Sequence, residues 1–241
     1  MIDKQSPLPI YYQIEEDIKQ RIADDEYRPG DMISSERELS ETYEVSRMTV
    51  RQAITNMVNE GVLFREKGRG TFVADKKIEQ PLQGMTSFTE DMKSRGMDAS
   101  SKLLIFEQIT APFDIARKLQ IDEQADVYKI QRIRYADQKP MAVETTFIPV
   151  AMLPGLSERV VQGSLYDYIE KTKKLQIGKA SQMIEATTAD QNQSSLLEVP
   201  PLSAILYIER NSFLTDGTPF EVVKSSYRAD RYKFISDIYR A

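Results

Sequence analysis

The chain has 241 residues, of which 41% are hydrophobic and 29% charged, a composition typical of a soluble globular protein large enough for two domains. It contains neither cysteine nor histidine, which excludes disulfides, the common zinc sites and His-based catalytic triads. It also lacks an apolar run long enough to cross a membrane and the layout of a signal peptide, so we expect a cytoplasmic protein without a membrane partner. No cofactor is expected.

The net charge of −5 is unusual for a protein that binds nucleic acid, but the charge is unevenly distributed. Up to Ser46, five basic residues face twelve acidic ones, whereas Arg47–Gly70 carries five basic residues against two acidic ones. Contact with phosphate depends on the local patch rather than on the whole chain. A DNA-binding surface is therefore predicted within this short basic segment.

Three helical patterns are found in the N-terminal part. The first begins at Pro9 and stops at Pro29-Gly30. Ser35 to Glu38 has the form of a capping box and opens a short second helix. Ser46 is the N-cap candidate of a longer third helix that ends at Gly61.

Two short strands, Val62–Arg65 and Thr71–Val73, follow the third helix and enclose a basic, glycine-containing turn at Glu66–Gly70. Two successive capped helices, the second basic near its start, followed by a basic hairpin, predict a winged helix-turn-helix. Taken singly these signals have simpler explanations. Ser35 and Ser46 could serve only as caps, and Arg47 and Arg51 alone would be solvated charges.

The stretches Ser34–Leu39, Val45–Ala53, Gly61–Leu63 and Lys67–Val73 resemble the GntR family of bacterial regulators, although Ser34 stands where most members have proline. The resemblance implies that Arg37, Ser46, Arg47, Thr49 and Arg51 contact phosphates and base edges, and that Gly68 and Arg69 enter the minor groove. Arginine suits base reading because its fork matches guanine O6 and N7. The full predicted DNA-binding set is Ser35, Arg37, Ser46, Arg47, Thr49, Arg51, Gln52, Lys67, Gly68, Arg69 and Gly70.

The second part of the chain begins after a polar segment, which divides the sequence into a DNA-binding domain (1–74), a linker (75–84) and a larger domain (85–241). The capping box at Ser87–Glu90 opens a helix that ends at Gly96. Beyond it the pattern predicts an α+β domain around a largely antiparallel sheet. The expected strands are Lys102–Ile109, Val127–Tyr135, Met141–Ile148, Gly178–Thr187, Ala204–Leu214 and Phe220–Tyr227, with helices near Pro112–Leu119, Leu165–Lys171 and Asp190–Leu197.

Arg132 and Arg134 are expected on one partly apolar strand face, where two adjacent arginines need anions. With a five-residue turn, Arg134 would lie opposite Glu144 on the next strand. The alternative to a ligand site is a cross-strand ion pair, which the residues alone slightly favour. Ser164 likewise could serve only as the N-cap of the helix that contains Tyr166.

The larger domain resembles the HutC-type effector domain (UTRA), a chorismate-lyase-like fold. Across essentially the whole chain, the runs Lys4–Pro7, Leu82–Gly84, Thr86–Met97, Ser164–Asp167 and Tyr227–Tyr232 are similar to members that regulate amino-sugar utilisation. This similarity implies that glucosamine-6-phosphate or N-acetylglucosamine-6-phosphate is the effector. The predicted effector-binding residues are Ser87, Phe88 and Thr89 at a helix start, Arg132 and Arg134 for the phosphate, and Glu144, Ser164, Tyr166, Glu221 and Tyr227 for the sugar.

We therefore expect a transcriptional regulator, a repressor by family default, that binds a palindromic operator in double-stranded DNA as a homodimer, because one helix-turn-helix covers a half-site. Two alternatives remain. The domain could sense another anionic metabolite, such as a carboxylate. It could also act as a lyase-like enzyme, with Glu144 or Glu221 as acid or base.

Overall fold

The computed structural model describes residues 2–75 and 77–238, and the chain divides into two compact units, residues 1–78 and 79–241. Each unit has its own hydrophobic core, and each is described by itself. Among the described residues, no helix is long and apolar enough to cross a membrane.

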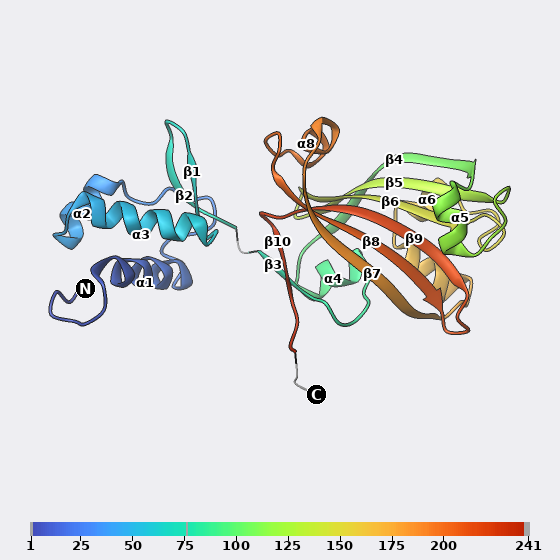
Figure 1. Cartoon of the computed structure of the whole chain (residues 1–241), viewed down its shortest axis with the longest axis horizontal. Coiled ribbons are helices and arrows are strands. Elements are labelled where there is room, and N and C mark those ends of the chain that lie inside the picture. Colours follow the sequence, from blue (N-terminus) through green and yellow to red (C-terminus); the bar gives the residue numbers. More distant parts are fainter. Residues whose placement is uncertain (1, 76, 239–241) are drawn as a thin grey trace. The chain divides into compact units, whose positions relative to one another are not determined.

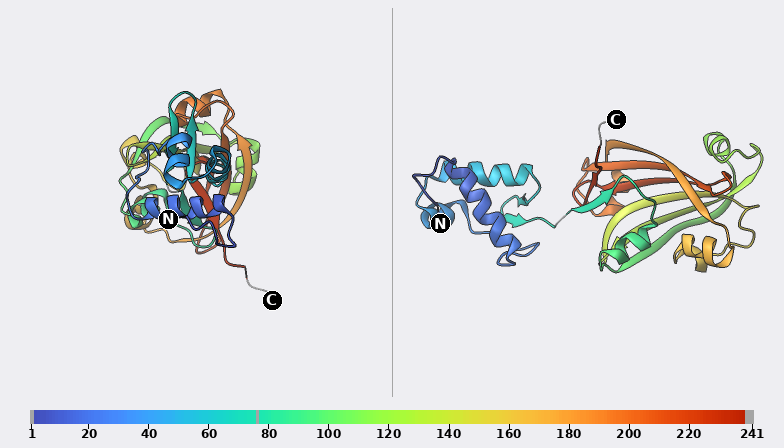
Figure 2. Two further views of the ribbon diagram at one scale, coloured as in Figure 1. Left: turned by 90° about the vertical axis from the view of Figure 1, so that its left-hand side faces the viewer. Right: turned by 90° about the horizontal axis from the view of Figure 1, so that it is seen from below.

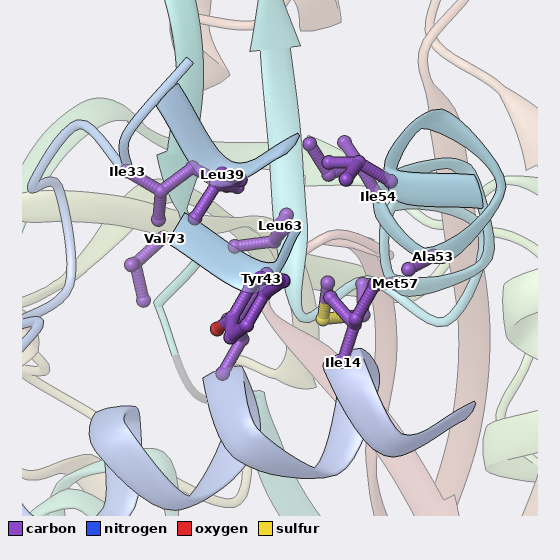
Figure 3. Close-up of a cluster of buried hydrophobic side chains, with 11 residues drawn as sticks. Ile14, Ile33, Leu39, Tyr43, Ala53, Ile54, Met57, Leu63 and Val73 are labelled. Carbon is purple, nitrogen blue, oxygen red and sulfur yellow. The ribbon is translucent and has the colours of Figure 1, made fainter. Parts of the chain in front are cut away.

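The N-terminal unit consists of three helices and a hairpin (Figure 1): α1 (Ile10–Ala23), α2 (Glu36–Tyr43), α3 (Arg47–Asn59), β1 (Leu63–Glu66) and β2 (Gly70–Val73). The apolar residues that recur every three or four positions in the helices meet in one buried cluster. Figure 3 shows Ile14 of α1, Tyr43 of α2 and Met57 of α3 converging with Leu63 of β1. The predicted winged helix-turn-helix is confirmed.

Both predicted helix caps are confirmed. The Ser35 hydroxyl accepts a hydrogen bond from the Glu38 amide while the Glu38 carboxylate accepts one from the Ser35 amide, which completes the capping box of α2. The Ser46 hydroxyl accepts a hydrogen bond from the Thr49 amide at the start of α3. Between the two helices Glu44 adopts the left-handed conformation (φ 53°), which ends α2 abruptly and sets up the tight turn.

The wing is a short antiparallel hairpin in which Glu66 pairs with Gly70. Gly68 has a φ of 76° at the turn, a conformation that costs glycine little. Gly70 has a φ of 142°, a backbone conformation that residues with a side chain rarely adopt. The Phe64 and Phe72 rings stack with their centroids 5.6 Å apart and support the hairpin behind its tip.

The C-terminal unit is built on one curved six-stranded sheet (Figure 1, Figure 2) with the antiparallel order β4-β5-β6-β9-β8-β7. Each of the six strands overlaps a segment predicted from the alternation of β-branched and aromatic residues. Their bounds are β4 Ala99–Thr110, β5 Asp126–Ala136, β6 Lys139–Pro149, β7 Ile177–Thr188, β8 Ala204–Leu214 and β9 Pro219–Arg228.

Helices cover the two faces of this sheet. On one face α5 (Phe113–Leu119) packs against Val127 and Val222. On the other face α6 (Glu158–Val161), α7 (Leu165–Asp167) and the π-helical turn Tyr168–Thr172 pack against Tyr128 and Phe220. The remaining helices are α4 (Phe88–Ser94), which begins at the predicted Ser87–Glu90 capping box, and α8 (Gln191–Leu197).

Two strands were missed by the sequence analysis. β3 (Ile78–Pro81) pairs with β10 (Tyr232–Ile235) as a separate two-stranded ribbon. Because β3 falls inside the segment predicted as a linker, residues 75–84 are not structureless throughout. Both strands are four residues long, and their pairing joins distant parts of the chain, so no local periodicity reveals it.

The predicted register between β5 and β6 was wrong. Arg132, not Arg134, lies opposite Glu144, while Arg134 lies opposite Ala142. The turn contains only Asp137 and Gln138, both with positive φ, and a register shift follows between Arg134 and Tyr135. Two left-handed residues form the tight turn favoured by hairpins, and the irregularity next to it changes the pairing.

Candidate effector pocket and DNA-recognition surface

The predicted DNA-binding residues form an exposed surface on the N-terminal unit. Of the eleven, only Thr49 is half-buried, and the other ten are exposed. They belong to the starts of α2 and α3 and to the wing, the elements that the winged helix-turn-helix presents to DNA. The apolar face of α3 supplies Val50, Ala53, Ile54 and Met57 to the core, which leaves its polar face outward.

Carboxylates hold several of these arginines in place. The Arg51 guanidinium lies 2.8 Å from the Glu36 carboxylate, and Arg37 donates to Glu41 over 3.0 Å. Arg69 in the wing is paired with Glu66. Such exposed ion pairs contribute little to stability, so exchanging a carboxylate for a DNA phosphate costs little. These ion pairs orient the arginines without preventing them from contacting DNA.

The ten predicted effector residues all line a single pocket on the sheet face opposite α5. The pocket is lined by charged and hydroxyl-bearing side chains together with apolar ones, a lining typical of sites for small polar molecules. Ten further residues complete its lining. They are Gln80, Thr86, Asp91, Leu165, Ile208, Arg210, Val223, Ser225, Tyr232 and Phe234.

Arg134 marks the cationic part of the pocket. Its guanidinium lies 4.7 Å from the centroid of the Phe88 ring and donates a 3.1 Å hydrogen bond to the Thr89 hydroxyl at the start of α4. Burial lowers the pKa of Arg134, an effect that the charge of Glu144, 3.9 Å away, partly opposes. Its Nε is buried without a hydrogen-bond partner within the described part of the chain, so the site retains donor capacity for an anion.

Arg132 is engaged differently. Its guanidinium donates to the Glu144 carboxylate and, over 2.8 Å, to the carbonyl of Val161 at the end of α6. Burial alone would raise the pKa of Glu144, but the charges of Arg132 and Arg134 outweigh it and hold that pKa below its ordinary value. The cross-strand ion pair considered from the sequence is therefore present, although it is made by Arg132 and lies inside the pocket.

Glu221 occupies a second polar part of the pocket, away from the start of α4. Its carboxylate accepts hydrogen bonds from the Tyr166 hydroxyl (2.9 Å) and the Ser212 hydroxyl (3.2 Å). Burial, together with the charge of Glu144, raises the pKa of Glu221 to about 7, while the hydrogen bond from Tyr166 works in the opposite direction. This group can therefore accept or donate a hydrogen bond to a sugar substituent near neutral pH.

Ser87 and Ser164 lie in the pocket wall but also serve as caps. The Ser87 amide donates to the Glu90 carboxylate, and the Ser164 hydroxyl accepts from the Asp167 amide. The Ser87 amide, which was expected to contact a phosphate, is thus already hydrogen-bonded within the helix cap. The amides of Phe88 and Thr89, in the first turn of α4, remain the candidates from this segment.

Arg210 and Tyr232 line the pocket but were not among the residues predicted from the sequence. Ile208, Arg210 and Ser212 are two positions apart on β8, so their side chains share one face of the strand. This is the sheet face that also carries Glu221. Tyr232 lies on β10, where its ring meets the Tyr227 ring edge-on at 4.7 Å. Its hydroxyl is buried without a hydrogen-bond partner among the described residues. β10, which pairs with β3, carries this residue to the pocket.

Each of the two units of the chain matches a known domain. Residues 10–73 match the model for the gntR family of bacterial regulatory proteins, and residues 94–233 match the UTRA domain. The chain belongs to the GntR family. Its UTRA domain places it in the HutC subfamily, as the sequence indicated.

This chain is similar to GntR-family relatives and to solved structures along nearly its full length. The chain is 46% identical over 97% of its length to the HTH-type transcriptional repressor NagR of Bacillus subtilis, of which 96% is covered. It is 37% identical over 94% of its length to the repressor MngR of Escherichia coli, also covered to 94%. The crystal structure of PhnF from Mycobacterium smegmatis superimposes with a TM-score of 0.69 at 31% identity, covering 95% of this chain and all of that one.

These comparisons decide between two of the readings left open by the sequence. The family model and the full-length relatives identify a DNA-binding transcriptional regulator rather than a lyase-like enzyme. Regulators of this family bind operator DNA and small-molecule effectors, which the two units of this chain match.

Proposed function

We propose that this GntR-family regulator represses amino-sugar utilisation genes. It binds a palindromic operator as a homodimer and responds to glucosamine-6-phosphate or N-acetylglucosamine-6-phosphate. Its similarity to the repressor NagR supports repression, and the resemblance to amino-sugar regulators supports the choice of effector. The observation that carries the proposal is the chemistry of the pocket, which has separate sites for an anion and for sugar substituents.

Arg134, Thr89 and the first turn of α4 are assigned to the phosphate. The guanidinium supplies charge, the hydroxyl and the Phe88 and Thr89 amides supply hydrogen-bonding groups, and the Phe88 ring shields the site from water. Arg132 is placed to support this site by compensating Glu144, so that the buried carboxylate does not repel the incoming anion.

Glu221, Tyr166 and Tyr227 are assigned to the sugar. Buried hydroxyl and carboxyl groups discriminate strongly between substituents because a mismatched ligand leaves them unpaired. Glu221 suits an amine or an amide N–H at the end of the ligand distant from the phosphate. Burial and the charge of Glu144 raise the pKa of Tyr227 to about 12, so its hydroxyl stays protonated and can donate.

The response to effector follows from linkage. A sugar phosphate lowers operator affinity if it binds the operator-bound arrangement of the DNA-binding units more weakly than another arrangement. The factor by which operator binding weakens the effector's affinity equals the factor by which the effector weakens operator affinity. A tenfold loss of operator affinity requires about 1.4 kcal/mol of coupling.

The test is fluorescence anisotropy of the full chain on a labelled palindromic operator, titrated separately with both sugar phosphates, glucosamine, glucose-6-phosphate and inorganic phosphate. The proposal expects an amino-sugar phosphate to change operator affinity at least tenfold, and the partial ligands to act weakly. If neither amino-sugar phosphate changes operator binding, the assigned effector is wrong.

A second ligand class has one specific observation in its favour. The relative MngR is named for mannosyl-D-glycerate, a sugar carrying a carboxylate, and arginines bind carboxylate as well as phosphate. A thermal-shift panel that includes sugar acids separates the two classes, since only a ligand of the native state raises the melting temperature. A rise with sugar acids alone would favour this second class.

A further inference from the structure

Met48 is an exposed apolar side chain on the otherwise polar outer face of α3. It is 67% exposed and takes no part in the core cluster of the N-terminal unit. The residues of α3 that do belong to this cluster are Val50, Ala53, Ile54 and Met57. Single exposed apolar residues are common on protein surfaces, so exposure alone assigns Met48 no role.

Helical periodicity places Met48 at the middle of the outer face of α3. Consecutive residues of an α-helix are about 100° apart around its axis, so Met48 lies about 170° from the centre of the buried stripe. Gln52 follows one turn later and lies beside it on the surface. Met48 is the second residue of the helix, and the first turn of a recognition helix contacts base edges. The side chain therefore projects outward from the turn that enters the groove.

Cations surround Met48 on this side of the unit. Arg47 precedes it in the chain, and Arg51 follows it by nearly one turn. The Glu36 carboxylate lies 2.8 Å from the Arg51 guanidinium and 3.6 Å from that of Arg65 in the hairpin, so it holds both toward one side. These cations complement DNA phosphates, whereas a thioether has no hydrogen to donate to a phosphate oxygen. Met48 must therefore meet a different part of the duplex.

The base edges of the major groove present one methyl group, the C5-methyl of thymine. The other groups there are hydrogen-bond donors and acceptors, which an apolar side chain would leave unpaired. Methionine is flexible and polarizable, so it adapts to a small apolar surface. Contact with a thymine methyl would remove both apolar groups from water, which is favourable in proportion to the area buried.

We propose that Met48 reads a thymine in each operator half-site by packing against its C5-methyl group in the major groove. Met48 is thus a specificity-determining residue, because cytosine and the purines have no methyl group at the corresponding edge. The arginines around it supply the charge that attracts the duplex, and Met48 adds a preference for one base. This inference rests on the proposed operator binding and names one base that the operator must contain.

Removal of single methyl groups from DNA tests the contact. The probe is a labelled duplex selected by the full chain from random sequences, in which each thymine is replaced in turn by deoxyuridine. Deoxyuridine pairs as thymine does but lacks the C5-methyl. Anisotropy should reveal one thymine in each half-site whose replacement weakens binding by the wild-type chain about fourfold, the effect of one methyl group. Replacement in both half-sites should weaken it about fifteenfold.

The variant Met48→Ala tests the protein side of the contact. It should bind the thymine duplex more weakly than the wild type does and lose nothing further with deoxyuridine at the identified position. The substitution keeps the fold because Met48 is exposed and alanine favours helix, which a thermal melt checks. Met48→Leu retains an apolar side chain and should remain sensitive to the methyl group. Leu202→Ala, at a position 74% exposed in the C-terminal unit, is the matched control and should behave as the wild type.

The outcome is separable from that of the proposed function. If no thymine methyl affects binding by the wild-type chain, or if Met48→Ala loses as much affinity with deoxyuridine as the wild type does, Met48 does not read thymine. Either result leaves the proposed function intact when an amino-sugar phosphate still changes the affinity for the selected duplex. A wild-type chain that selects no duplex would overturn the proposed operator binding and this inference with it.

Discussion

Arg132 and Glu144 face each other across β5 and β6, and the arginine donates a hydrogen bond to the carboxylate inside the effector pocket. Their side chains are 5% and 12% exposed, so neither charge is well hydrated. Removing one member of such a buried pair is costly because the other remains uncompensated, whereas replacing both by apolar residues is often tolerated. This relationship separates the role of Arg132 from that of Arg134.

Arg132→Ala should lower the free energy of unfolding by about 3–5 kcal/mol, because Glu144 is left buried without its main partner. Urea denaturation followed by circular dichroism measures this. The double variant Arg132→Met/Glu144→Leu should recover much of the loss. A single variant as stable as the wild type would contradict the structural role of Arg132.

Arg134→Gln should abolish the response to a phosphate-bearing effector while operator binding in its absence is retained. The side chain contacts Phe88 and Thr89 at the proposed phosphate site but has a weaker ion pair, 3.9 Å from Glu144. Anisotropy with and without effector measures both quantities. Undiminished effector response would exclude Arg134 from the anion site.

Glu221→Gln should stabilise the protein at alkaline pH. The pKa of Glu221 is raised from 4.5 to about 7, so the folded state binds this proton more tightly than the unfolded chain does. Stability contributed by the protonated form is complete below pH 4.5 and is lost as the pH rises through about 7. The variant should exceed the wild type by up to about 3 kcal/mol at pH 8, by conversion of the pKa shift.

That difference should shrink as the pH falls and vanish below pH 4.5, which denaturation at several pH values will show. The same variant should weaken binding of an amine-bearing ligand more than binding of its acetylated counterpart, because it removes a carboxylate charge. Equal pH profiles for variant and wild type would contradict the raised pKa.

Ser46→Ala should destabilise the N-terminal unit by about 1 kcal/mol, the usual effect of removing an N-cap. Ser46→Asp keeps a capping acceptor but places a negative charge where a DNA phosphate is expected. It should therefore retain stability and lose operator affinity. If Ser46→Asp binds the operator normally, Ser46 acts only as a cap.

Arg69→Ala in the wing should weaken binding to all DNA sequences alike. A cation in the minor groove displaces counterions and reads the bases only weakly, so the slope of log K against log salt should fall by about 1. Lys102→Ala, which removes one exposed positive charge from β4 of the C-terminal unit, is the matched control for nonspecific effects of charge. A loss confined to one operator position would indicate base reading by Arg69 instead.

The sequence alone indicated the features that rest on local chemistry. The caps at Ser35, Ser46 and Ser87 depend on a side chain three residues from the amide it binds, so their signature is contiguous. The central strands of the larger unit are recognisable because burial of one or both faces imposes a pattern on consecutive residues.

Only the tertiary structure decided which residues meet. The tight turn at Asp137-Gln138 and the irregularity after it, rather than any periodicity, placed Glu144 opposite Arg132. Tyr232 reaches the pocket because β10 pairs with a strand more than a hundred residues earlier in the chain. Long-range pairing depends on the packing of the whole unit, which no local window contains. Half of the residues that line the pocket could therefore be named from the sequence, but their contacts could not.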